Sequence, residues 1–102
     1  MKMKVDFTDF IAAFQYRGRT ANFQPEGLRA LYNYLRDYEE LLGEELELDV
    51  IALCCDYTEY ASIEDAADAY RIDTADIDEA LEELRDRTVV IPFRLGVILQ
   101  NF

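Results

Sequence analysis

The stretch that decides the fold is PEGLRALYNYLRDYEELLG, residues 25–43. Its proline suits the first turn of a helix, where a backbone N–H is not needed, and its last glycine is a typical helix terminator. Between the two, apolar residues recur in steps of three and four, at Leu28, Leu31, Leu35, Tyr38 and Leu42. This spacing predicts one long amphipathic helix with an apolar face turned to the core.

A shorter helix is predicted on the N-terminal side, over residues 8–17. Phe7, Phe10, Ile11 and Phe14 recur at helical spacing, and Gly18 follows as a stop. This helix adds an aromatic face to the core.

On the C-terminal side, residues 47–55 form a β-branched and apolar run, which predicts a central strand. Cys54 and Cys55 are neighbours in this run, so strand alternation sends their side chains to opposite faces and disfavours a mutual disulfide. We expect both thiols to pack in the core, where burial suppresses their reactivity.

Two further helices and a hairpin follow. Ser62 to Asp65 has the form of a capping box and opens a helix that ends near Tyr70. A second helix, from residue 74 or 76 to about 86, has an apolar stripe of Ile77, Ala80, Leu81 and Leu84.

The last two segments, residues 88–93 and 97–102, read as strands joined by a turn at Gly96, and Pro92 indicates an edge or a bulge. In the last strand we expect Val97, Leu99 and Asn101 on one face and Ile98, Gln100 and Phe102 on the other.

These elements predict an α+β fold in the order helix-helix-strand-helix-helix-strand-strand, with the helices packed on a small three-stranded, mainly antiparallel sheet. We expect one acidic domain over residues 1–102, since no repeat or long linker divides the chain. No apolar run approaches the roughly 20 residues of a membrane helix, and the N-terminus lacks a signal-peptide core. The expected location is cytoplasmic, with no membrane contact.

Charge is distributed unevenly along the chain. The net charge is -12, from 22 acidic and 10 basic residues. Residues 1–43 are electroneutral, with Lys2 and Lys4 among their six bases, whereas residues 44–86 hold sixteen acids against Arg71 and Arg85. Self-repulsion costs stability, and solubility alone does not concentrate charge, so this zoning favours a surface selected for its potential.

The residue inventory disfavours catalysis. The chain has no histidine, which is the commonest general base and metal ligand, and its four glycines are too dispersed for a phosphate-binding loop. Asp73, Asp76, Asp78 and Glu79 are dense, but they lack the calcium-loop pattern and indicate only weak surface affinity for divalent cations. We therefore expect no enzyme, no catalytic residue, no metal site and no cofactor. The negative charge also disfavours direct nucleic-acid binding.

The acidic segment is the candidate binding surface. On a helical wheel with Ile77, Leu81 and Leu84 inward, the outer half holds Asp76, Glu79, Glu82, Glu83 and Asp86. Each pair of like charges at helical neighbour spacing costs about 0.2–0.5 kcal/mol. Carboxylates three or four positions apart rise about 4.5–6 Å, which approaches the spacing of successive phosphates. Acidic helices are often only solvated faces, but the zoning favours a functional one. The candidate partner-binding residues are Asp56, Glu59, Tyr60, Glu64, Asp65, Asp68, Asp73, Asp76, Glu79, Glu82, Glu83 and Asp86.

The stretch LDVIALCCDYTEY (residues 48–60), with Val90-Ile91-Pro92 and the ending Ile98-Leu99-Gln100-Asn101-Phe102, resembles small acidic proteins encoded in phages and prophages. The likeness spans most of the chain. It implies a phage setting, in which small acidic proteins are often inhibitors of host defence, including antirestriction and anti-CRISPR proteins that imitate DNA. It implies no catalytic residue.

The leading hypothesis is a DNA-mimic inhibitor, monomeric or homodimeric, whose acidic face blocks the basic nucleic-acid-binding channel of a host defence protein complex. A rival is a regulatory or assembly protein that binds its partner through an apolar edge strand or a Tyr surface, with the acids serving solubility. An enzyme is the third class, and no obvious base, nucleophile or cofactor site supports it.

Overall fold

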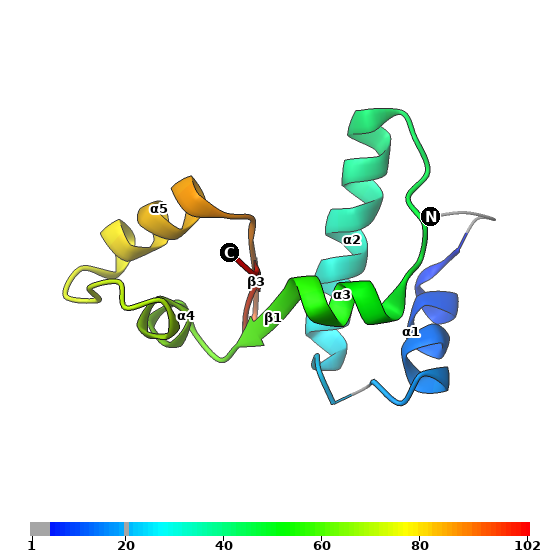
Figure 1. Ribbon diagram of the computed structural model, residues 1–102, viewed down its shortest axis with the longest axis horizontal. Coiled ribbons are helices and arrows are strands. Elements are labelled where there is room, and N and C mark those ends of the chain that lie inside the picture. Colours follow the sequence, from blue (N-terminus) through cyan, green and yellow to red (C-terminus); the bar gives the residue numbers. More distant parts are fainter. Residues whose placement is uncertain (1–4, 20) are drawn as a thin grey trace.

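Five helices and a three-stranded sheet make up residues 5–19 and 21–102, the part of the chain that the computed structural model describes. Lys2 and Lys4 lie outside this part. No helix within it is both long and apolar enough to cross a membrane. The elements are α1 (Phe7–Tyr16), α2 (Pro25–Leu42), α3 (Val50–Asp56), β1 (Tyr57–Tyr60), α4 (Ile63–Ala69), α5 (Ile77–Arg87), β2 (Val90–Phe93) and β3 (Gly96–Gln100), as Figure 1 shows.

The sheet confirms the α+β class. Its strand order is β1-β3-β2 and both pairings are antiparallel, so the last strand of the chain is the central one. Tyr57 of β1 lies opposite Gln100, and Val90 of β2 lies opposite Leu99. Pro92 is on the edge strand β2, as predicted, because only an edge or a bulge tolerates the missing N–H.

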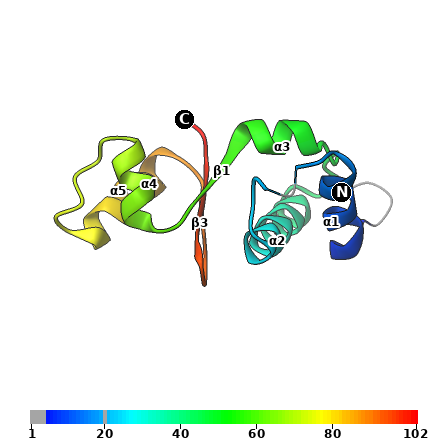
Figure 2. The ribbon, with the colours of Figure 1, turned by 90° about the horizontal axis from the view of Figure 1, so that it is seen from below.

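Strand β3 is buried on both faces. Ile98 belongs to the cluster formed with α1, α2 and α3, whereas Val97 and Leu99 belong to the cluster formed with α4 and α5. None of the three is more than 1% exposed. Figures 1 and 2 show the sheet between these two helical layers.

The alternation predicted for the last strand is thus confirmed for residues 97–99. It fails at Phe102, whose ring stacks on Tyr70 with 3.9 Å between centroids, on the side of α4. The strand ends at Gln100, so its two-residue alternation does not extend to the last two residues.

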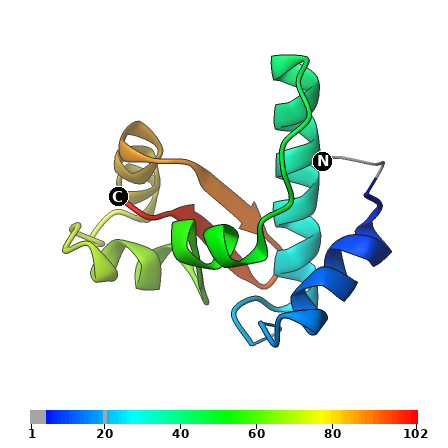
Figure 3. The same ribbon diagram turned by 45° about the vertical axis from the view of Figure 1, so that its right-hand side comes forward.

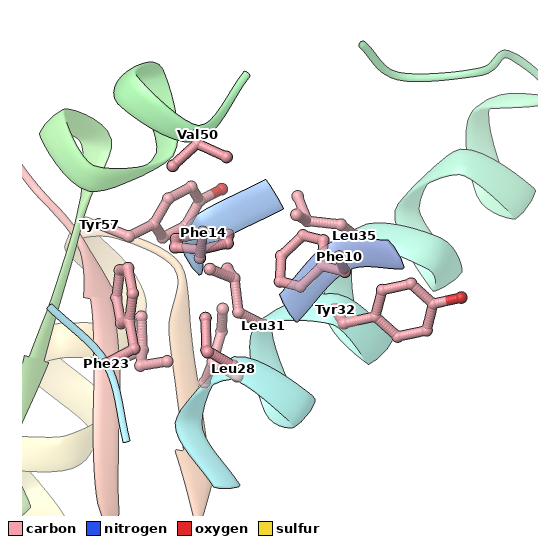
Figure 4. Packing of buried hydrophobic residues seen from close by; sticks show 11 residues of the cluster. Phe10, Phe14, Phe23, Leu28, Leu31, Tyr32, Leu35, Val50 and Tyr57 are labelled. Carbon is pink, nitrogen blue, oxygen red and sulfur yellow. The ribbon is translucent and has the colours of Figure 1, made fainter. Parts of the chain in front are cut away.

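The larger cluster is built from aromatic residues of α1 and leucines of α2 (Figure 4). Phe10 and Phe14 are completely buried, with their ring centroids 5.0 Å apart. Both helices match the predicted positions, and each is followed by a glycine with a positive φ, +65° at Gly18 and +69° at Gly43. Such a backbone conformation is readily adopted only by glycine, which explains why both helices stop there.

The predicted central strand over residues 47–55 is wrong. Residues 45–49 are irregular and α3 follows them, because the Asp49 carboxylate accepts a hydrogen bond from the N–H of Ala52 at 3.0 Å and caps the helix. Val50, Leu53 and Cys54 have helical spacing and pack on the larger cluster, whereas Cys55 is exposed. The strand begins only at Tyr57, and β1 is an edge strand.

Helix α3 ends without a glycine, and Asn101 satisfies its last carbonyl groups. The Asn101 side-chain amide donates to the Cys55 carbonyl at 2.8 Å, and its backbone N–H donates to the Asp56 carbonyl at 2.7 Å. Free carbonyls at a helix end need such partners. The end of the chain is thereby tied to the junction of α3 and β1.

Because β3 packs against both helical layers, truncating a side chain on either face of it should destabilise both layers together. We expect Ile98→Ala and Leu99→Ala each to lower the free energy of unfolding by about 2–5 kcal/mol, with one cooperative transition in denaturant. Leu41→Ala is the control, since Leu41 is 83% exposed. A variant in which one layer melts separately from the other would contradict this description.

Candidate protein-binding surface

Helix α4 begins at the cap that the sequence predicts. The Ser62 hydroxyl accepts a hydrogen bond from the N–H of Asp65 at 3.0 Å, which satisfies one of the free donors of the first turn. Ala66 and Ala67 are completely buried. The remaining face of the helix, with Glu64, Asp65 and Asp68, is exposed.

Helix α5 begins at Asp76. Its carboxylate accepts hydrogen bonds from the N–H groups of Asp78, at 3.0 Å, and Glu79, at 3.3 Å. Ala80 and Leu84 are buried against the smaller cluster, which confirms the inner face of the helix. Ile77, which the helical wheel puts inward, is 41% exposed at the first helical position.

Together, α4 and α5 make a strongly acidic layer on one side of the sheet (Figure 2). Residues 61–88 hold ten acids against Arg71, Arg85 and Arg87. Nine of these acids are exposed and Glu83 is half-buried. Ile77 is the one large apolar side chain exposed within this range, all of which the structure describes. Phe102, which is 49% exposed and stacks on Tyr70, adds a second apolar side chain, so a partner that binds here meets mainly charge.

Three of the predicted binding residues within this layer have structural partners. Asp76 caps α5, and Asp73 accepts a hydrogen bond from the N–H of Ala75 at 2.9 Å. Glu83 forms an ion pair with Arg87 at 3.0 Å. These carboxylates are already used inside the layer and are less available to a partner.

The helix dipole accounts for some of the other acids. Glu64 and Asp65 lie in the first turn of α4, and Glu79 lies in the first turn of α5. A negative charge there is stabilising by about 0.3–1 kcal/mol. Sequence reasoning left Asp78 out of the site, although it is exposed in the same turn. Its place two residues after the Asp76 cap was the available signal.

Asp68, Glu82 and Asp86 have no such local role. Asp68 and Asp86 lie in the last turns of their helices, where the dipole disfavours negative charge. All three are exposed, and none of their carboxylates makes a hydrogen bond or ion pair within the part of the chain that the structure describes. On α5, Glu82 and Asp86 share with Glu79 an arc of about 60°. We call Glu79, Glu82 and Asp86 the acidic stripe of α5.

The structure separates Glu59 from this layer. Its carboxylate accepts the N–H of Gln24 at 3.0 Å, at the start of α2 on the other side of the sheet. The approach is close, because a Cβ on Gly27 would overlap this carboxylate. Glu59 is therefore an anchor for α2, because its carboxylate meets the positive end of the helix dipole.

The other two predicted residues also stand apart from the stripe. Asp56 ends α3, which belongs to the opposite layer. Tyr60 is half-buried against the smaller cluster, so it supports the α4–α5 layer from the sheet. Burial is the main cause that raises the pKa of its hydroxyl, followed by the neighbouring Tyr70.

The cysteines differ from each other. Cys54 packs partly against the larger cluster, and burial raises the pKa of its thiol, whereas Cys55 is exposed on the outer side of α3. The expectation that both lie in the core is wrong for Cys55, because the segment is a helix. Within residues 5–19 and 21–102, no three His, Cys, Asp or Glu side chains are grouped so as to hold a metal ion.

Replacing Glu59 should affect folding. We expect Glu59→Ala to lower the free energy of unfolding by about 1–2 kcal/mol, because the start of α2 loses its carboxylate partner. Glu82→Ala is the matched control and should change stability by less than about 0.5 kcal/mol. Chemical denaturation measures both, and equal stability of the two variants would leave Glu59 in the binding surface.

The two thiols should be distinguishable by substitution. We expect Cys54→Ser to lower the free energy of unfolding by about 1–3 kcal/mol, because a partly buried hydroxyl lacks a partner. Cys55→Ser should leave the melting temperature nearly unchanged. Faster alkylation of Cys54 than of Cys55 would contradict the two environments.

The acidic layer is defined by the position, exposure and partners of its carboxylates. Comparisons with known protein families, with curated proteins and with solved structures find no match to this chain. Its function has to be inferred from which carboxylates are exposed and unpaired. Glu82 and Asp86 of the acidic stripe, together with Asp68, are the carboxylates of the layer that neither internal contacts nor the helix dipole explains.

Proposed function

We propose that the chain is a non-catalytic, phage-type inhibitor of a host defence nucleoprotein that acts as a DNA mimic in the host cytoplasm. The outer face of α4 and α5 docks on the basic channel that otherwise holds nucleic acid, and so excludes DNA. The sequence resemblance implies the antirestriction and anti-CRISPR classes, and the members of these classes that imitate DNA act in this way.

The observation that carries the proposal is the acidic stripe of α5. Glu79, Glu82 and Asp86 are exposed, lie on one helical face and have no internal partner in the described part of the chain. Their mutual repulsion costs stability, and a basic partner would remove that cost. Within residues 61–88 Ile77 is the one large exposed apolar side chain, and Phe102 stacks on Tyr70 of the same layer, so exposed charge outweighs exposed apolar surface and electrostatic attraction is the main force available.

The rival function, binding through an apolar edge strand or a Tyr surface, has a different physical basis. Of its two versions, the Tyr surface has support in Tyr38 of α2, which is 40% exposed and lies in the other layer with the exposed Leu41 and Leu42. Contacts of this kind depend weakly on salt, whereas contacts made by the acidic stripe weaken steeply as salt rises. A salt series with the retained partner distinguishes the two.

The decisive variant reverses the stripe, with Glu79, Glu82 and Asp86 replaced by Lys. Asp76 and Glu83 stay unchanged, because one caps α5 and the other pairs with Arg87. We expect circular dichroism to show a folded protein and affinity for the partner complex to fall more than about tenfold, since like charges then face each other. Retention from host lysate, followed by competition with DNA for the purified complex, measures the loss.

The control makes the same charge change elsewhere. Asp37, Glu40 and Glu44 are exposed acids of α2 and the segment after it, and their reversal to Lys alters the net charge equally. This control should keep DNA competition nearly intact. Equal loss in both variants would indicate attraction by net charge alone, and equal binding by the wild type and the stripe variant would exclude α5 from the surface.

A further inference from the structure

A second candidate site lies in the other layer, between α2 and α3. The chain leaves the end of α2, runs back beside it and turns into α3, as Figures 1 and 3 show. Between these segments and the end of the sheet lies a groove of about 380 Å³. This volume is within the range of about 300–1,000 Å³ typical of ligand sites.

One wall of the groove is aromatic. Tyr34 and Tyr38 are four residues apart on α2, and their rings are stacked with 6.0 Å between centroids and 21° between planes. Leu42 lies one turn further along the same face of α2 and is 47% exposed. A ligand in the groove can therefore extend over an apolar surface at its edge.

Tyr57 forms part of the floor. The residue is only 9% exposed, yet its hydroxyl makes no hydrogen bond within the described part of the chain. Burial first, and then Tyr34, Asp56 and Tyr38, raise the pKa of this hydroxyl to about 12. The hydroxyl oxygen itself is not fully enclosed, so a group bound in the groove could form a hydrogen bond with it.

The rim of the groove is acidic. Glu47, Asp49 and Asp56 line it, and none of its lining residues is basic. Asp56 lies at the C-terminal end of α3, where the helix dipole disfavours negative charge and no base lies in the last turn. Its carboxylate has no hydrogen bond or ion pair among the described residues. A bound cation would relieve this unfavourable charge.

We propose that the groove binds an arginine side chain presented by an extended segment of a protein partner. A guanidinium group is planar, so it can lie on the tyrosine rings while its N–H groups donate to the Asp56 carboxylate and the Tyr57 hydroxyl. Lysine offers no planar group for stacking. The exposed Leu42 on the same face of α2 favours a polypeptide over a free small cation.

This site is separate from the acidic stripe of α5, because the two lie in different layers on opposite sides of the sheet. The stripe variant should therefore still bind an arginine peptide through the groove. Failure of the DNA-mimic proposal and failure of the groove proposal are thus distinguishable.

The probe is a blocked Gly-Gly-Arg-Gly-Gly peptide, titrated into the protein while the NMR signals of the tyrosine rings are followed. We expect the signals of Tyr34, Tyr38 and Tyr57 to shift, and the same peptide with neutral citrulline in place of arginine to leave them in place. Asp56→Asn should weaken binding about tenfold, because a charge-assisted hydrogen bond is lost. Tyr38→Leu should weaken it independently of charge.

Asp37→Asn is the matched control, since it removes one exposed carboxylate of α2 that does not line the groove. It should change the affinity less than twofold. Equal weakening by Asp37→Asn and Asp56→Asn would reduce the effect to the net charge and overturn the proposal. Equal binding of the citrulline peptide, or of a lysine peptide, would overturn the assignment to arginine.

Discussion

Strand β3 can turn neither of its faces to water, since Val97, Ile98 and Leu99 are each at most 1% exposed. A strand buried on both faces needs an apolar layer on each side, and this requirement places α1–α3 opposite α4–α5. The edge strands are correspondingly short, with four residues each. The acidic stripe of α5 and the groove between α2 and α3 lie apart because this central strand separates their layers.

The predictions that succeeded depend on local chemistry. Pro25, Gly43, Gly18 and the Ser62 cap act within a few residues of their own position, so the bounds of α1, α2 and α4 can be found without tertiary contacts. The prediction for residues 47–55 failed because it weighed β-branched composition above spacing. The Asp49 cap and the helical interval between Val50 and Leu53 were the better signal, and α3 is completed by Asn101, which is distant in sequence.

The candidate site shows the same limit. A helical wheel put the acids of α5 opposite Ile77, Leu81 and Leu84, and of these three Leu84 is buried, Leu81 is half-buried and Ile77 is exposed. It could not show that Asp76 caps the helix, that Glu83 pairs with Arg87 or that Glu59 holds the start of α2. Each of these uses depends on rotamers or on contacts across the sheet. Density of carboxylates in a sequence therefore overstates the charge that is free to bind.

The position of a carboxylate relative to the helix dipole distinguishes a binding role from ordinary solvation better than its exposure does. First-turn acids stabilise a helix, whereas Asp68, Asp86 and Asp56 lie in last turns and act against the dipole. Two of these three belong to the α4–α5 layer, and the third is on the rim of the groove. An unfavourable charge that a bound cation would neutralise is a sharper indication of a basic partner than the net charge of the chain, because solubility could be met equally well by acids in first turns.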